Sequence, residues 1–273
     1  MVDDQPLDSS ERRRRRYPSD VSNREWATIK PFLTQSPGPG RPRTVDLRAI
    51  MNAIFYINRT GAQWRMMPRD FPFWSHAYYY FRSWSRDGTW RRINDALREK
   101  VRLGAGKLAD PSAAIIDTQS VKTTEAGGPR GFDVHKQVKG RKRHVVVDTL
   151  GLLLIVVVHI ASIQDPAGAK LALTPLTDRF PRLARIWADG IYKGPLVAWV
   201  KEQLGCLLLI VTRTDGQRGF QALPKRWIVE RTPAWLNRNR RLSKDYERDP
   251  LMSENMVYLA SIRLLLRRLD KRE

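Results

Sequence analysis

Five short apolar runs between residues 113 and 211 constrain the fold of this chain more than any other feature. They cover residues 113–116, 143–148, 152–160, 184–188 and 207–211. Runs this short, bounded by Gly, Pro and polar residues, are typical of buried strands. The break at Thr149-Leu150-Gly151 suits a hairpin between the second run and the third. We therefore expect a sheet built from this part of the chain.

Segments with helical spacing separate the later runs. They cover residues 168–180 and 196–204, and a basic helical segment follows from about residue 224. The expected order is βββαβαβα, in which three antiparallel strands are continued by parallel crossover units. That order predicts an α/β (α+β) mixed sheet with helices on its faces, and it is similar to the ribonuclease-H-like fold.

Residues 19–104 have helical spacing without strand runs. Ser22 and Glu25 form a capping box, Thr44 is placed to cap a second helix that Gly61 ends, and Ser75 is placed to cap a third. A fourth helix is expected from about residue 90 to residue 103. Several short helices with basic exposed faces resemble a helix-turn-helix DNA-binding module. The alternative is a plain helical cap whose aromatic residues form a core.

The charge of the chain favours a polyanionic partner. It has 49 Lys and Arg against 28 Asp and Glu, a net charge of +21. Such an excess predicts salt-sensitive attraction to nucleic acid, although a ribosomal-type, non-catalytic binder would share it. Residues 1–18 contain five consecutive arginines, Arg12 to Arg16, and read as a disordered basic tail that either grips phosphates or has no role.

Several classes of protein are disfavoured. The single cysteine, Cys206, cannot form an intramolecular disulfide and is expected to be a small buried hydrophobe in a reducing compartment. The four histidines lack the spacing of a zinc site. The longest apolar run, residues 150–158, is too short to cross a bilayer, and no apolar stretch of a secretory signal follows the arginines. We expect a cytoplasmic protein without a membrane partner.

Three acids stand where a metal-dependent nuclease would need them. Asp117 and Asp189 each follow an apolar run, and Glu230 lies in the basic helical segment. Converging carboxylates can hold two hard divalent cations that clamp the attacking and leaving oxygens of a phosphodiester. Each acid alone has an ordinary explanation, a turn for either aspartate and an i−4 pair with Arg226 for Glu230. Asp133, Asp148 and Asp165 compete less well, because they fall at hairpin or loop positions.

Two basic segments are expected to contact DNA phosphates close to these acids. The first precedes the second strand, and the second surrounds Glu230 on the expected helix. A solvated hairpin is the alternative for the first segment. The candidate DNA-binding residues are Lys136, Lys139, Arg141, Lys142, Arg143, Arg226, Arg238 and Arg241.

The chain resembles bacterial insertion-sequence transposases of the DDE type, in the group named after insertion sequence five. The resemblance runs from about residue 17 to residue 269, and several ordered motifs carry it. They include Arg-Thr-Gly-Ala-Gln-Trp-Arg (59–65), Asp-Thr-Gln-Ser-Val-Lys (117–122), Val-Lys-Gly-Arg-Lys-Arg-His (138–144), Ala-Asp-Gly (188–190), Val-Glu-Arg-Thr (229–232) and Asn-Arg-Arg-Leu-Ser-Lys-Asp-Tyr-Glu (239–247).

The resemblance implies a DNA transposase that cleaves the ends of its element and joins them to target DNA. The family's catalytic carboxylates fall on Asp117, Asp189 and Glu230, which would bind two Mg²⁺ or Mn²⁺ ions. The ribonuclease-H-like fold would place the strands of Asp117 and Asp189 side by side in a catalytic domain at residues 111–269, after the helical module at 19–104. The implied partners are double-stranded DNA, as terminal inverted repeats and target, and further copies of the chain in a nucleoid-associated complex.

Two departures from the family pattern lead to alternatives. Ile191 stands where the family usually has a second glycine, and a β-branched residue there is expected to strain the loop that carries Asp189. Pro233, in place of an aromatic residue, either disturbs the helix of Glu230 or begins a new helix. The alternatives to an active transposase are a non-catalytic or decayed DNA-binding remnant and a structure-specific nuclease on the same fold.

Overall fold

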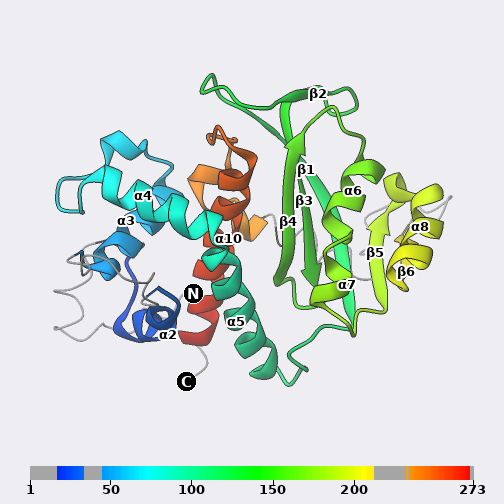
Figure 1. Ribbon diagram of the computed structural model, residues 1–273, viewed down its shortest axis with the longest axis horizontal. Coiled ribbons are helices and arrows are strands. Elements are labelled where there is room, and N and C mark those ends of the chain that lie inside the picture. The colour runs from blue at the N-terminus through cyan, green and yellow to red at the C-terminus, as the bar shows by residue number, and fades with distance from the viewer. Residues whose placement is uncertain (1–16, 34–44, 212–231, 233, 271–273) are drawn as a thin grey trace, which may run out of the picture.

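The computed structural model describes residues 17–33, 45–211, 232 and 234–270. A mixed sheet lies between two layers of helices (Figure 1). The first layer contains α2 (Asn23–Leu33), α3 (Leu47–Thr60), α4 (Trp74–Arg86), α5 (Thr89–Leu103) and α10 (Pro250–Asp270). The second contains α6 (Asp165–Leu173), α7 (Leu176–Arg179) and α8 (Pro195–Leu204). Short 3₁₀ helices are η1 (Trp64–Met66), η2 (Gly190–Tyr192) and η3 (Arg240–Leu242).

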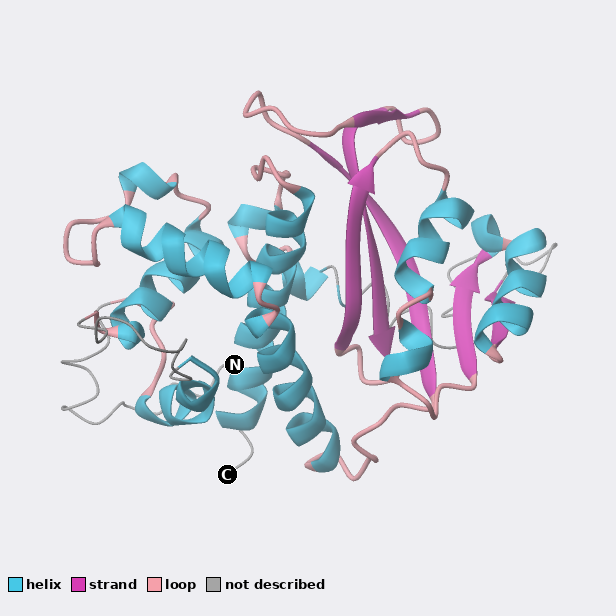
Figure 2. Cartoon of the chain, in the orientation of Figure 1, coloured by secondary structure: helices cyan, strands magenta, loops and turns pink. Residues whose placement is uncertain are grey.

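The sheet has the expected mixture of antiparallel and parallel strands. Its order is β2-β3-β1-β5-β6, with β4 paired to β3. The strands are β1 (Ala113–Lys122), β2 (Gly131–Asp133), β3 (Val138–Asp148), β4 (Leu153–Ile160), β5 (Arg185–Asp189) and β6 (Leu207–Val211). β1 is antiparallel to β3 and parallel to β5, while β5 is parallel to β6. Figure 2 shows the strands gathered in one half of the molecule and the N-terminal helices in the other, which confirms the predicted fold class.

The two faces of the sheet belong to two apolar cores. Ile115 and Val147 face the layer that contains α5 and α10, whereas Ile116 and Val146 face α6 and α8. Side chains of neighbouring residues on a strand point to opposite faces, so the near-continuous apolar runs are those of strands buried on both sides.

The helix starts were predicted correctly in one case and wrongly in two. The amide of Ser22 donates to Glu25 Oε2 at 2.8 Å and the amide of Glu25 donates to Ser22 Oγ at 3.0 Å, so the capping box is confirmed. The cap of α3 is Asp46, whose carboxylate accepts from the amides of Arg48 and Ala49, rather than Thr44. Helix α4 begins at Trp74, so Ser75 lies inside it. The predicted end of α3 at Gly61, with φ 75°, is confirmed.

Two strands extend into polar sequence that the apolar runs did not mark. β1 continues to Lys122 and β3 begins at Val138, so that Ser120 pairs with Lys142 and Gln119 with Arg143. Asp117 therefore lies in the middle of its strand and not at its end. The expected helix at 168–180 is divided into α6 and α7. These segments are strands although their residues are polar, because the backbone hydrogen bonds between β1 and β3 continue along the whole ladder.

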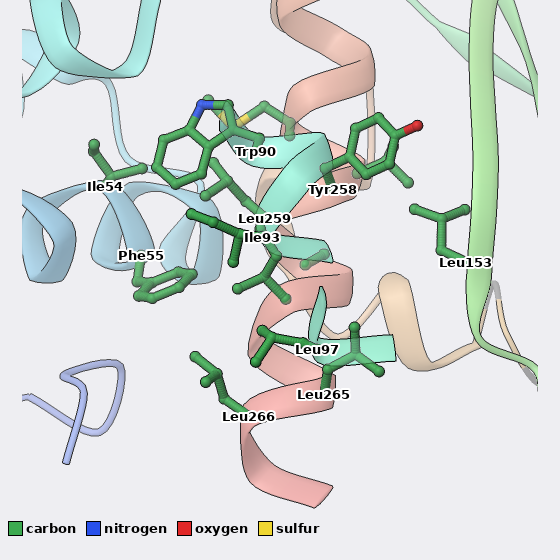
Figure 3. Packing of buried hydrophobic residues seen from close by; sticks show 14 of the residues in the cluster. Ile54, Phe55, Trp90, Ile93, Leu97, Leu153, Tyr258, Leu259, Leu265 and Leu266 are labelled. Atoms are coloured by element: carbon green, nitrogen blue, oxygen red, sulfur yellow. The ribbon is translucent and has the colours of Figure 1, made fainter. Parts of the chain in front are cut away.

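Helix α10 joins the N-terminal helices into one core. Leu259 and Leu265 pack among Trp90, Ile93 and Leu97 of α5, as Figure 3 shows. On its other side α10 reaches β4, where Leu153 belongs to the same core. The sequence placed residues up to 269 in the catalytic domain, but the packing of α10 makes one continuous core from the helical module and one face of the sheet.

Tyr17, which was predicted to lie in the disordered tail, is part of the folded chain. It stacks on Phe71 and donates a hydrogen bond to Asp70 Oδ1 at 3.0 Å. Residues 1–16, including the five arginines, lie outside the described residues. Among the helices of the described ranges, none combines the length and the apolar character needed to cross a membrane.

Candidate active site

Asp117 and Asp189 lie on neighbouring parallel strands. The ladder between β1 and β5 ends with Ile115 opposite Trp187. Continued by two residues on each strand, the same register places Asp117 opposite Asp189. Because residues two apart share a face of a strand, both carboxylates are on the side of Ile115 and Trp187. That side faces the layer that contains α5 and α10.

A small cavity lies beside Asp117 on that face. Its volume is about 20 Å³, enough for one water molecule. Residues from β1, β3, the segment after residue 231 and α10 line it: Asp117, Gln119, Arg143, Val145, Val147, Thr232, Leu236, Asn237, Leu242 and Val257. Thr232 is buried and donates to the carbonyl of Gly151 at 3.1 Å. The chain therefore passes the wall of this cavity two residues after Glu230.

Asp189 ends β5 and begins the 3₁₀ helix η2. Its carboxylate accepts a hydrogen bond from the amide of Ile191 at 3.1 Å, which fixes the turn. The prediction of backbone strain at Ile191 is wrong, because Ile191 does not have positive φ. In the described part of the chain, Gln137 is the only non-glycine residue that does. A 3₁₀ turn accepts a β-branched residue in the right-handed region, and Ile191 is 43% exposed to solvent.

The third expected carboxylate cannot be placed with the other two. Glu230, Arg226 and Pro233 lie outside the described residues. Within the described ranges, no group of three His, Cys, Asp or Glu side chains is arranged to hold a metal ion. Asp117 and Asp189 nevertheless supply carboxylate oxygens, the donors that hard divalent cations prefer, so the chemistry of this pair fits Mg²⁺ or Mn²⁺ if one more ligand joins it.

The competing aspartates have structural partners instead. Asp148 is fully buried, forms an ion pair with Arg102 of α5 and accepts the amides of Leu150 and Leu152 at the β3–β4 turn. Asp133 and Asp165 both lie within ion-pair distance of Lys142 Nζ, at 3.6 and 2.9 Å. These carboxylates hold the sheet and its connections together.

Three of the predicted phosphate-binding residues on β3 are buried. Arg141 is fully buried, pairs with Asp245 at 3.2 Å and donates to the carbonyls of Glu247 and Arg248. Arg143 donates to the carbonyls of Leu242 and Lys244. Their guanidinium groups tie residues 242–248 to the sheet, so they are not a surface for DNA in this structure. Burial lowers the pKa of Arg143, and the nearby Asp245 opposes that effect.

The remaining basic candidates divide between structure and surface. Arg241 is buried and pairs with Glu247 at 2.8 Å, and Lys142 is buried between its two aspartates. Lys136, Lys139 and Arg238 are exposed. Lys136 donates to the carbonyl of Thr118 at 3.0 Å, directly beside Asp117. The expected basic helix from about residue 224 does not reach Arg238 or Arg241, since turns follow residue 236 and Arg241 lies in η3.

A polar cluster on the opposite face of the sheet was not predicted. The hydroxyl groups of Thr118 and Tyr192 form a hydrogen bond there. His144 and His159 lie next to it, with His144 Nδ1 and His159 Nε2 2.9 Å apart. The signal in the sequence was the alternation of Thr118 and Ser120 within β1, which places two hydroxyl groups on a face that Ala114 and Ile116 make apolar.

Burial controls protonation in this cluster. Together with a smaller effect of the neighbouring His159, it lowers the pKa of His144 to about 3. Burial also raises the pKa of Tyr192 well above its usual value, so its hydroxyl stays protonated. Helix α6 can approach the imidazoles because residue 168 is glycine, where a Cβ atom would stand 2.3 Å from His159 Nε2.

Two segments of the chain match known protein families. Residues 21–94 match the family described as "Putative transposase of IS4/5 family (DUF4096)", and residues 108–265 match the family described as "Transposase DDE domain". The chain is also 29% identical over 118 residues to the "Insertion element IS402 uncharacterized 16.2 kDa protein" of Burkholderia cepacia, a stretch that covers 41% of this chain and 78% of that protein. Since the second family match spans more than half of the sequence, the chain belongs to the DDE transposase domain family.

Proposed function

We propose that this protein is the DNA transposase of an insertion sequence, which cleaves the ends of its element and joins them to target DNA. The observation that supports the proposal is the parallel pairing of β1 with β5, whose register reaches Ile115 opposite Trp187, two residues before Asp117 and Asp189. Acids with this placement, on a chain of net charge +21, suit phosphoryl transfer on a polyanion. The family itself implies a DNA substrate and the use of divalent metal ions.

Asp117, Asp189 and Glu230 are proposed to hold two Mg²⁺ or Mn²⁺ ions. When bound, such ions would supply Lewis-acid stabilisation of the attacking and leaving oxygens. The sheet holds the backbone of both aspartates in place. Asp117 lies inside β1, which is paired with β3, and Asp189 lies on β5, which is paired with β6 along its whole length. The apolar side chains of Val145, Val147 and Leu236 limit access of water on the inner side of the cavity.

Other groups near Asp117 are suited to hold the DNA. Lys136 is exposed and donates to the carbonyl of Thr118, the residue after Asp117, while Gln119 and Asn237 line the cavity beside Asp117. Lys139 and Arg238 are proposed to contact phosphates further out. A water molecule for cleavage and a DNA 3′-hydroxyl for joining are sufficient nucleophiles, so no covalent intermediate with the protein is required. Because two element ends must be processed together, we also propose that the active complex contains more than one copy of the chain.

The test is nicking of terminal-repeat DNA by Asp117→Asn and Asp189→Asn variants. We expect each to lower Mg²⁺-dependent nicking by about a thousandfold, since metal ligation accounts for several kcal/mol of transition-state stabilisation. DNA affinity should persist, as the charge excess remains. Asp178→Asn, at an exposed position on α7, is the matched control and should nick normally.

Two other outcomes would replace this proposal. A wild-type protein that binds DNA but never nicks it with Mg²⁺ or Mn²⁺ would be a non-catalytic remnant. A protein that cuts branched DNA but joins no strands would be a structure-specific nuclease on the same fold.

A further inference from the structure

The backbone ladder between β1 and β5 stops before it reaches the two aspartates. Among the described residues of these strands, the last pair is Ile115 with Trp187, two residues before Asp117 and Asp189. Backbone hydrogen bonds between the two strands therefore do not fix the separation of the carboxylates. A pair of bound metal ions needs that separation to be held within a fraction of an ångström.

A side-chain contact on the reverse face connects the strands just beyond this point. Thr118 follows Asp117 directly, and Tyr192 lies at the end of η2, the turn that begins at Asp189. Their hydroxyl groups form a hydrogen bond, and both side chains are buried, Tyr192 almost completely. The bond thus links the residue after one carboxylate to the turn that is hydrogen-bonded to the other.

The surroundings of Tyr192 make this link rigid. Its ring belongs to the apolar core between the sheet and α6, α8, and lies edge-on to the ring of His144 at 6.3 Å between centroids. Asp189 also accepts the amide of Ile191 at 3.1 Å, so η2 moves with its carboxylate. A displacement of Tyr192 would therefore shift Asp189 relative to Asp117.

We propose that the Thr118–Tyr192 hydrogen bond positions Asp117 and Asp189 for joint metal binding, from the face of the sheet opposite the metal. Tyr192 and Thr118 are positioning residues, because neither is on the face that would touch metal or DNA. The inference rests on the proposed function, since it assumes that the two aspartates bind metal together.

The experiment compares Mn²⁺ binding by wild type, Tyr192→Phe and Thr118→Val, each titrated calorimetrically in the absence of DNA. Both substitutions keep the shape of the side chain and remove one hydroxyl group. We expect Mn²⁺ affinity to fall about tenfold in each, as is typical when a group that orients a metal ligand is lost. The double variant should be no weaker than either single variant, because both remove the same hydrogen bond.

The matched control is Tyr258→Phe, which removes the hydroxyl of another buried tyrosine, on α10. It should bind Mn²⁺ like wild type, even if it is equally destabilised. DNA affinity measured in EDTA should be the same for all variants, which separates positioning of the carboxylates from a general loss of folding.

Two results would overturn the inference, and they are distinguishable. If Tyr192→Phe and Thr118→Val bind Mn²⁺ as tightly as wild type while Asp117→Asn does not, the aspartates bind metal but the reverse-face bond does not position them. If wild type itself binds no Mn²⁺, or binds it as well as Asp117→Asn, the proposed function fails at this site and the inference fails with it.

Discussion

Buried titratable residues decide how stability varies with pH, and two of them act in opposite directions. Burial raises the pKa of Glu254 to about 7 and lowers that of His144 to about 3. Between pH 7 and pH 5 the folded state therefore takes up a proton on Glu254 that the unfolded state does not, which stabilises the fold as the pH falls. The unfolded state takes up a proton on His144 that the folded state refuses, which destabilises the fold over the same range.

A Glu254→Gln variant should separate these effects. The amide oxygen of the glutamine can still accept a hydrogen bond from the amide of Val158, as Oε1 of Glu254 does at 2.9 Å. Between pH 7.5 and pH 5 we expect its free energy of unfolding to fall by about 2–3 kcal/mol more than that of wild type, because it lacks the two-unit gain from Glu254. The remaining fall of about 2 kcal/mol would come from His144.

Urea unfolding at both pH values measures this difference. The control is His135→Gln, whose side chain is exposed, and it should follow the wild-type pH dependence. Equal pH dependence in wild type and Glu254→Gln would show that Glu254 titrates normally in the folded state.

Single residues also show what the sequence could and could not predict about the site. Asp117 and Asp189 were recognisable because each follows an apolar run, but that their strands are neighbours follows only from the parallel pairing of β1 with β5, which ends two residues before them. The sequence predicts a phosphate-binding surface at Arg141 and Arg143 because it displays their charge and not their partners. Those partners are carbonyl groups and Asp245, about a hundred residues later in the chain. The third acid, Glu230, stays a prediction.

Among the helices, α4 presents the clearest surface for DNA. Its buried side consists of Ala77, Phe81, Trp84 and Ser85, while His76, Tyr79, Arg82 and Arg86 are exposed on the other side at intervals of three or four residues. The helix contains no acidic residue. A face with cations and an aromatic ring suits phosphates and bases, so we expect α4 to be the helix of the N-terminal module that lies against DNA.

An Arg82→Ala/Arg86→Ala variant tests that expectation. If both arginines contact phosphates, DNA affinity should fall and the slope of log K against log salt should decrease by about two. Lys100→Ala/Lys107→Ala is the charge-matched control, with both lysines exposed near the far end of α5. Fluorescence anisotropy between 50 and 200 mM salt measures both quantities. Equal slopes for the two variants would mean that α4 contributes only general charge.

At the level of elements, prediction worked where apolar periodicity was strong and failed where polar residues take part in a ladder. The runs at 152–160, 184–188 and 207–211 correspond to β4, β5 and β6 within one residue. The polar halves of β1 and β3 were missed, because hydrogen bonding between them is enough to form strands without an apolar signal. The predicted cap of α3 was wrong because two nearby side chains, those of Thr44 and Asp46, are both suited to accept hydrogen bonds from the amides of the first turn. In the structure Asp46 is the cap.

The whole molecule is organised around α10, which the sequence order gave no reason to place among the N-terminal helices. The sequence pattern predicted no separate helix at residues 250–270, and only the folded arrangement brings α10 against α5 and β4. The helical module and the sheet consequently share a core, in which Leu259 and Leu265 of α10 lie with Trp90 of α5 and Leu153 of β4 (Figure 3). We therefore expect the whole chain to unfold in a single cooperative transition, although its family matches divide it near residue 100.

Leu259→Ala should test the cooperativity that this shared core implies. Leu259 is fully buried, so we expect a loss of 2–5 kcal/mol in the free energy of unfolding, a range typical of a leucine-sized cavity. Leu251→Ala, on the same helix but 39% exposed, should cost less than about 1 kcal/mol. Five of the nine tryptophans lie in the helical module, with Trp84 and Trp90 buried there, so fluorescence gives that module more weight than far-UV circular dichroism does. Because α10 is common to the module and the sheet, the two signals should shift together in Leu259→Ala, and a shift in fluorescence alone would mean that the helical module unfolds independently of the sheet.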